Sequence, residues 1–119
     1  MQIALLVAQG LLAVAFLGAG ASKLAGADSM TEDFDRFGYS RRFMHFTGGM
    51  EIFGALALVA GFWWPLWAVL GAGAIATTML GALGTHLRTG DPVGRLLPPL
   101  VLGALAAWVL VGHGPALGA

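Results

Sequence analysis

The stretch that decides the fold is FTGGMEIFGALALVAG, residues 46–61, in which one carboxylate, Glu51, stands among small and apolar residues. Apolar residues continue on both sides, so the tract covers about residues 43–62. At 1.5 Å per residue, about 20 residues in a helix cross a hydrocarbon core of about 30 Å. The stretch therefore predicts a membrane-spanning helix that carries a single acid.

The rest of the chain has the same character. Of its 119 residues 58% are hydrophobic and only 10% are charged, and the mean hydropathy is +0.83. Three more tracts are long and apolar enough to span, at about residues 3–22, 65–87 and 96–112. A soluble bundle would need a polar stripe along each helix, and these tracts have none. We therefore expect an all-α, integral membrane four-helix bundle in which residues 1–119 form one domain.

Other interpretations of the chain are less well supported than a membrane-spanning bundle. The first tract could be a cleaved signal peptide, but it has no basic segment before it, so a retained helix is favoured. The chain has no cysteine, which removes disulfide exchange, thiolate metal sites and cysteine-ligated iron–sulfur clusters. The formal net charge is zero and no basic cluster could grip a phosphate backbone, so nucleic acid is not expected as a partner.

Lysine and arginine gather in two of the connections, residues 23–42 and 88–95. By the positive-inside rule both connections face the cytoplasm, and both termini face outward together with the Trp63-Trp64-Pro65 turn. Pro65 suits the first turn of the third spanning helix. The polar segment 28–42 is either a short helix lying at the interface, aromatic side down, or an irregular loop.

The start of the fourth spanning helix contains several prolines. Asp91 followed by Pro92 resembles an N-cap and a first-turn proline. Pro98 and Pro99 then predict a kink, which would leave this helix short and broken at its inner end.

Small residues spaced four apart recur in the spanning tracts. Such spacing lets helix backbones approach closely in a bilayer, so it predicts a tight bundle, and it could equally serve a homo-oligomer or contacts with other membrane proteins. The pairs are Ala4 and Ala8, Gly18 and Ser22, Ala72 and Ala76, Gly81 and Thr85, and Gly103 and Ala107, together with Gly54, which is paired with the larger Leu58 and flanked by Gly61.

Glu51 lies near the predicted midplane, where an acid costs about 2.5–3.5 kcal/mol and is usually given a partner or a task. Counting residues from the turn at 63–64 places Thr77 and Thr78 level with it, so a threonine is the expected hydrogen-bonding neighbour. Lys23 and His86 come out deeper, His86 by about 13 Å, although helix tilt, a shifted register or the long stem of Lys23 could close the gap. In the simplest interpretation, Glu51 is a neutral acid whose hydrogen bond to a threonine or a backbone carbonyl holds the bundle together.

The basic side chains have simple interpretations too. Lys23 could extend to the interface, and His86 could face headgroups. His45 and His113 are expected at the interface. A haem held by His45 and His86, or a metal held by His86, Asp91 and Glu51, is only weakly indicated. We therefore expect no haem, metal or flavin, and a quinone is the one cofactor for which the polar residues would suit.

Four segments together resemble the DoxX-like family of small four-helix membrane proteins. They are GAGASKLAG at residues 18–26, GGMEIFGALALVAG at 48–61, TTMLGALGTHLRTGD at 77–91 and PPLVLGALAAW at 98–108. The resemblance implies that Lys23, Glu51 and His86 are signature positions that converge in the inner half of the bundle, in a bacterial inner membrane. It also implies links to redox and oxidative-stress complexes, among them a thiosulfate:quinone oxidoreductase subunit, and in animals to receptor-assembly chaperones.

Three functions follow as hypotheses. The first is a subunit or partner of a redox or stress-response complex that binds a quinone-like lipophile near Glu51, with Glu51 and His86 passing protons. The second is a scaffold or assembly factor whose polar residues, Lys23, Glu51, Thr77, Thr78 and His86, are a purely structural core. The third is a small proton-coupled carrier, for which four helices leave little room. The sequence leaves open whether the chain is an enzyme.

Overall fold

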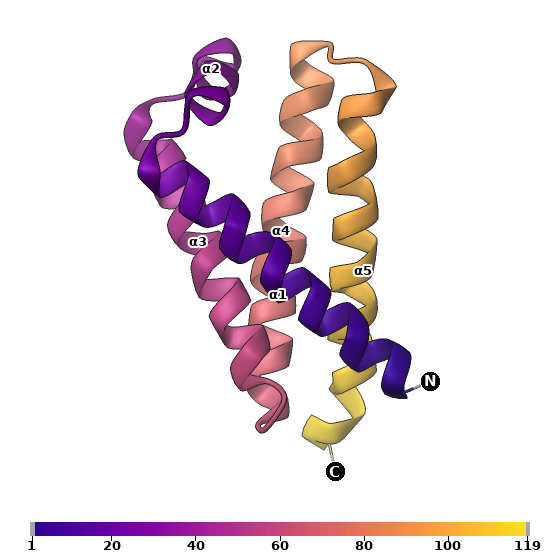
Figure 1. The fold of residues 1–119 in the computed structure, drawn as a ribbon. Helices are drawn as coiled ribbons and strands as arrows, with labels where there is room; N and C mark the ends of the chain where they lie inside the picture. Colours follow the sequence, from indigo (N-terminus) through magenta and orange to yellow (C-terminus); the bar gives the residue numbers. More distant parts are fainter. Residues whose placement is uncertain (1, 119) are drawn as a thin grey trace.

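The computed structural model describes residues 2–118 and consists of five helices (Figure 1). They are α1 (Gln2–Ala25), α2 (Asp28–Phe37), α3 (Arg41–Ala60), α4 (Pro65–Thr89) and α5 (Val93–Gly118). Four of them, all except α2, are long and apolar enough to cross a membrane. The predicted all-α membrane bundle is confirmed. Relative to the bounds expected from hydropathy, α1 and α5 are longer at both ends, α4 is longer at its end, and α3 begins and ends two residues earlier.

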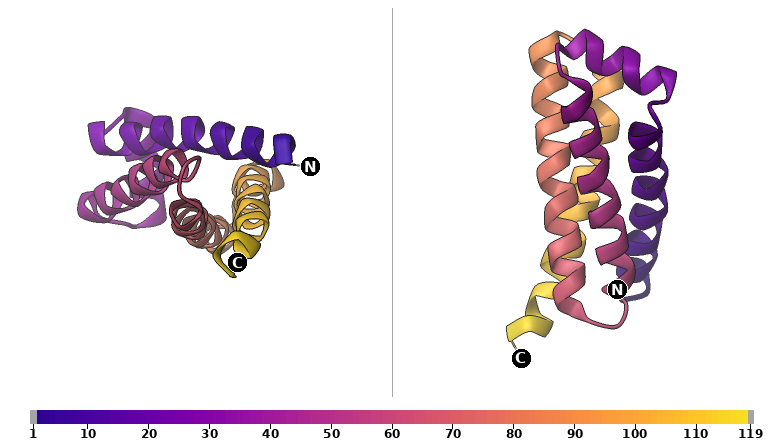
Figure 2. Two further views of the ribbon diagram at one scale, coloured as in Figure 1. Left: turned by 90° about the horizontal axis from the view of Figure 1, so that it is seen from below. Right: turned by 90° about the vertical axis from the view of Figure 1, so that its left-hand side faces the viewer.

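The helices follow one another around the bundle, except that α1 crosses it obliquely. α3 packs against α4 and α4 against α5, while α1 packs mainly along α3 (Figures 1 and 2). The first turns of α1 lie beside the last turns of α5, where Leu5 touches Gly112. From there α1 runs diagonally towards the start of α3. This tilt decides which residues of α1 can reach Glu51.

Two close approaches of helix backbones fix the position of α3. A Cβ atom on Gly48 would lie 2.8 Å from Cβ of Lys23 and 3.0 Å from the carbonyl oxygen of Gly20, so α1 and α3 meet here almost backbone to backbone. On the α4 side, a Cβ atom on Gly54 would lie 2.8 Å from Ile75. Such close packing is what stabilises the association of helices in a bilayer.

The expected small-residue pairs are therefore only partly correct. Gly54 and Gly103 do lie at helix contacts, but a Cβ atom on Gly18 or Gly81 would meet no atom within 4 Å. The tilt of α1 brings Gly20 rather than Gly18 to the contact. Spacing alone identifies a stripe of small residues but does not decide which one meets the neighbour.

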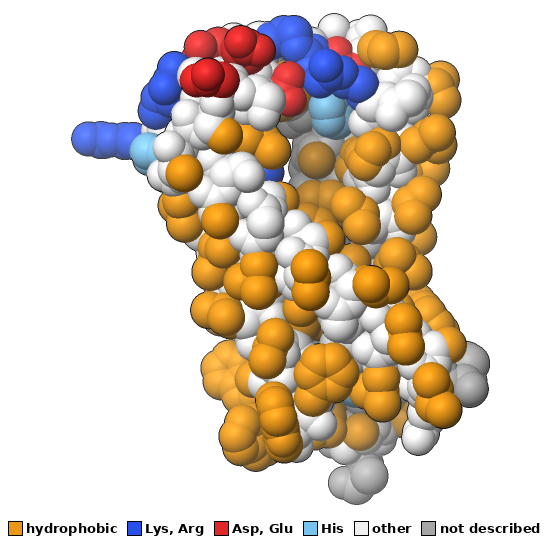
Figure 3. Space-filling model, viewed as in Figure 1, with side chains coloured by type: hydrophobic (Ala, Val, Ile, Leu, Met, Phe, Trp, Pro, Cys, Tyr) orange, Lys and Arg blue, Asp and Glu red, His pale blue; other side chains and the backbone are white. Residues whose placement is uncertain are grey.

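All the connections that carry charge lie at one end of the bundle, as Figure 3 shows. The segment 28–42 contains a regular helix, α2, which lies across this end, so the helical alternative was right. Gly26 and Gly38 flank α2 with positive φ angles of 70° and 82°, conformations that glycine adopts without strain. α1 starts and α5 ends at the opposite end (Figure 1).

The prediction of a short, broken final helix was wrong. α5 runs from Val93 to Gly118 with Pro98 and Pro99 inside it. Proline removes the hydrogen bonds to the carbonyl groups four residues earlier, and here those carbonyls belong to Gly94 and Arg95 in the first turn. This turn lies at the charged end, where water can take the place of the lost bonds. At the other turn, Pro65 begins α4 as expected.

Adjacent glycines in α3 provide a test of the α1–α3 contact. Gly48→Ala should destabilise the fold by about 1–3 kcal/mol, because the new methyl group overlaps α1. Gly49→Ala is the matched control, since nothing lies within 4 Å of its added Cβ atom, and alanine favours the helix. Thermal unfolding in detergent measures both variants. Equal effects of the two substitutions would contradict the contact.

Candidate functional site: a buried ion pair and a charged cap

Glu51 pairs with Lys23 inside the bundle. The Lys23 ammonium nitrogen Nζ lies 2.8 Å from Oε1 of Glu51, and the two side chains are only 11% and 2% exposed. The contact between Gly20 and Gly48 makes the pair possible, because it brings the backbone of α1 next to α3 one helical turn from Glu51, towards the charged end. The aliphatic stem of Lys23 then spans that turn.

The expected threonine partners were wrong. Thr77 Oγ1 donates to the carbonyl of Gly73 and Thr78 Oγ1 to that of Ala74, each at 2.8 Å within α4. Threonine can always satisfy its hydroxyl on its own helix in this way. An extended interfacial Lys23 is wrong too. The residue count misjudged its depth because α1 is tilted and the lysine stem is long.

The ion pair leaves one polar atom poorly satisfied. Oε1 of Glu51 is buried and no donor forms an aligned hydrogen bond with it, although the ammonium group is within ion-pair distance. The pair is therefore an electrostatic contact rather than an aligned hydrogen bond. Removing one member of such a pair costs about 3–5 kcal/mol, whereas replacing both with apolar residues is often neutral.

His86 belongs to a second cluster, at the charged end. Its Nδ1 atom lies 2.5 Å from Oδ2 of Asp91, and Arg36 of α2 binds the other oxygen of Asp91. Asp33 of α2 also accepts from Arg95 of α5 at 3.1 Å. We call these five residues, Asp33, Arg36, His86, Asp91 and Arg95, the charged cap. It ties α2 to α4 and α5.

Aromatic contacts reinforce the charged cap. The ring of Phe37 meets the imidazole of His86 edge-on, with centroids 5.3 Å apart. The Tyr39 hydroxyl lies 2.8 Å from Oγ1 of Thr85, and Arg88 donates to the carbonyl of Phe37 at 2.9 Å. His86 is thus held by α2 rather than turned to headgroups. Asp91 is not the helix cap that its position before Pro92 suggested: α5 begins at Val93, and the Asp91 oxygens bind the side chains of His86 and Arg36.

A third polar group, at the opposite end, was missed by the sequence reasoning. Gln9 is fully buried, and its Nε2 donates to the carbonyl of Leu58 at 2.7 Å. Nε2 of His113 lies 2.7 Å from Oε1 of the same glutamine. His113 therefore links α5 to α1 rather than lying free at the interface. The signal was a lone glutamine in an apolar tract, which in a bilayer needs partners.

The three polar groups are separate. No hydrogen bond or ion pair in residues 2–118 joins Glu51 to His86. Of the trio considered for a metal, His86 and Asp91 touch each other, while Glu51 pairs with Lys23. Within the described residues no three His, Asp or Glu side chains are grouped to hold a metal ion.

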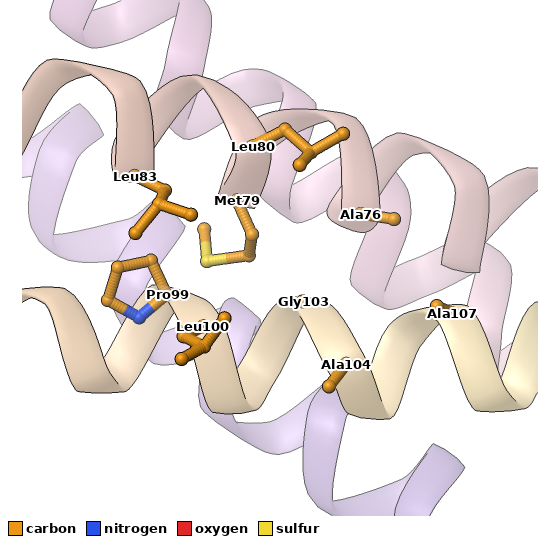
Figure 4. Close-up of a pocket in the computed structure, with 9 residues that line it drawn as sticks. All are labelled: Ala76, Met79, Leu80, Leu83, Pro99, Leu100, Gly103, Ala104 and Ala107. Atoms are coloured by element: carbon orange, nitrogen blue, oxygen red, sulfur yellow. The ribbon is translucent and has the colours of Figure 1, made fainter. Parts of the chain in front are cut away.

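Two apolar grooves lie on the outside of the bundle. One, of about 260 Å³, runs between α4 and α5 (Figure 4) and is lined by Ala76, Met79, Leu80, Leu83, Pro99, Leu100, Gly103, Ala104 and Ala107. The other, of about 200 Å³, is lined by Phe53, Leu56, Ala57, Ala60 and Trp67. Neither is lined by Lys23, Glu51 or His86. The polar groups face inward, and the grooves face the lipid.

Comparison with known proteins agrees with this architecture. The sequence profile of the DoxX-like family matches residues 7–109. The chain belongs to the DoxX-like family. It is also 36% identical over 103 residues to the uncharacterized protein YdgD of Bacillus subtilis (strain 168), a match that covers 85% of this chain and 90% of that protein. No solved structure matches significantly. As a DoxX-like protein with four spanning helices, it is a multi-pass membrane protein.

The charged cap predicts a pH dependence for α2. Hydrogen bonds from His86 and Arg36 lower the pKa of Asp91. A carboxyl group with a lowered pKa stabilises the folded state above its unfolded pKa of about 4, and this contribution is lost as the pH falls further. We expect amide hydrogen exchange in α2 to stay slow at neutral pH, after correction for the intrinsic rate, and to speed up below pH about 4.

Asp91→Asn is the matched control for this pH dependence. It should make α2 exchange faster at neutral pH and flatten the dependence. An unchanged pH profile in this variant would show that Asp91 does not hold α2.

Proposed function

We propose that this DoxX-like protein is a non-catalytic subunit or partner in a membrane complex of the redox or oxidative-stress type, and that Lys23 and Glu51 hold its bundle together. The observation that carries the proposal is their buried ion pair. A carboxylate compensated by a lysine is less available as a proton carrier than a free acid. The redox context comes from the family resemblance.

Contacts around the ion pair support a structural role. It stands beside the Gly20–Gly48 contact, where the backbones of α1 and α3 approach closely, so the charges also fix the register of the two helices. His86 supports the same interpretation, because its partners are Asp91 and Phe37 at the charged end. A proton route from Glu51 through His86 would need a link that these contacts do not provide.

A second candidate function is binding of a quinone-like lipophile near Glu51. The observation that favours it is the buried Oε1 atom, which lacks an aligned donor. The hydroxyl group of a quinol could donate to this oxygen, and quinone chemistry needs such proton partners. In that case Glu51 would be a ligand-binding residue, and the positive charge of Lys23 would favour its ionised form.

Replacing both charges distinguishes the two functions. Lys23→Met or Glu51→Leu alone should destabilise the bundle by about 3–5 kcal/mol, and the double variant should regain most of that stability. Thermal unfolding measures the stability. Growth under oxidant stress, in a host deleted for its own copy of the gene, measures the function. For a structural pair, the double variant restores both.

Other outcomes of this experiment favour the lipophile. A double variant that regains stability but not growth, and that loses a quinone found in organic extracts of the wild type, would make Glu51 a binding residue. Extracts without a quinone in both proteins, together with restored growth, would exclude that function. Both single variants provide the control for stability.

We also infer that the protein lies in a bacterial inner membrane with its charged end facing the cytoplasm. The start of α1 and the end of α5 then face outward. Five of the six Lys and Arg residues of the chain lie in the charged cap or beside it, and the sixth, Lys23, lies in the last turn of α1 at the same end, as the positive-inside rule requires. Because the chain has no cysteine, single cysteines can be introduced cleanly. An impermeant thiol reagent applied to intact cells should label Trp63→Cys and spare Ser29→Cys. The reverse pattern would invert the topology.

A further inference from the structure

Arg42, in the first turn of α3, differs from the other arginines. Arg36, Arg41 and Arg95 each pair with an aspartate, and Arg88 binds the Phe37 carbonyl and lies 5.3 Å from the centroid of the Tyr39 ring. Arg42 is exposed, and within residues 2–118 it has no acidic or hydrogen-bonding side-chain partner. A guanidinium group presents five donors, so it has the capacity to bind an external anion.

The surface below Arg42 is apolar and continuous. Phe46, Gly49, Phe53 and Leu56 follow at intervals of three or four residues, so they lie on the same side of α3 as Arg42. The rings of Phe43 and Phe46 stack beside this side, with centroids 6.3 Å apart. Phe46 is 63% exposed, Phe53 44% and Leu56 56%. A Cβ atom on Gly49 would meet nothing within 4 Å, so the surface between these two exposed rings is open.

The length of this face matches one leaflet. Half of a hydrocarbon core of about 30 Å is about 15 Å, or roughly ten residues of helix. Phe53 lies at that depth below Arg42, and the groove of about 200 Å³ lined by Phe53, Leu56, Ala57, Ala60 and Trp67 begins there. A charged donor at headgroup level, an apolar track and a groove at the end of the leaflet are the parts of a phospholipid site.

We propose that the outer face of α3 binds an anionic phospholipid. Arg42 holds the headgroup phosphate, and His45, exposed one turn further along, contributes a second donor. One acyl chain lies along Phe46 and Gly49 and ends in the groove at Phe53. Charge complementarity selects an anionic headgroup, because Arg42 has no internal counter-charge, whereas a zwitterionic lipid brings its own cation close to the site.

Arg41 and Arg42 make a matched pair for the test. Native mass spectrometry of the purified protein, titrated with phosphatidylglycerol or phosphatidylcholine, measures binding of each lipid. We expect wild type to prefer phosphatidylglycerol, and Arg42→Gln to weaken its binding by about fivefold, the effect of one basic side chain near an anionic surface. Arg41→Gln removes the same charge from the adjacent residue, which Asp35 already pairs, and should change binding little.

Further variants distinguish a lipid site from general charge attraction and from a site for free phosphate. Phe46→Ala should shorten the retention of phosphatidylglycerol, and Arg42→Lys should keep most of the binding. Equal losses in the Arg41 and Arg42 variants would overturn the site in favour of general charge attraction. Displacement of the lipid by excess inorganic phosphate would overturn the assignment to a lipid. Thermal unfolding checks that each variant is folded, and because both arginines are exposed, the changes should be small.

Discussion

The buried ion pair between Lys23 and Glu51 is the interaction on which the arrangement of the bundle depends. A bilayer offers no water to either charge, so each must find the other. Their distance of 2.8 Å is reached only because Gly20 and Gly48 let α1 and α3 approach to backbone contact. The glycines supply the proximity, and the charges make one register of the two helices better than its neighbours.

α3 is the helix around which the others are placed. Gly48 faces α1 and Gly54 faces α4, and the helical twist places Glu51 about halfway between these two contact faces. The acid therefore points into the bundle, where it is 2% exposed. The opposite side of α3 is free of helices and carries exposed aromatic rings. One helix thus combines a polar interior with a lipid-facing surface.

The polar groups pair with one another in three separate places. Glu51 has Lys23, Gln9 has His113 and the Leu58 carbonyl, and the charged cap joins α2 to α4 and α5. The lining of both grooves, in contrast, is apolar and faces outward. A protein of this kind has more capacity for contacts with lipids and membrane partners on its surface than for chemistry inside. This balance is the reason for proposing a partner or scaffold role.

The class of fold could be predicted from the amino-acid sequence, because the length and hydropathy of a tract suffice to predict a membrane-spanning helix. It also indicated Glu51 as a polar position that needs a partner, since ionisable groups are costly in a bilayer, and the resemblance to the DoxX-like family implied Lys23 and His86 as signature positions beside it. Which partners they find could not be predicted. The tilt of α1 brought Lys23 to Glu51 in place of Thr77 and Thr78, and α2 folded over the end to hold His86 through Asp91. Depth counted along straight helices ignores tilt and side-chain reach, so only the tertiary structure decided which polar groups meet.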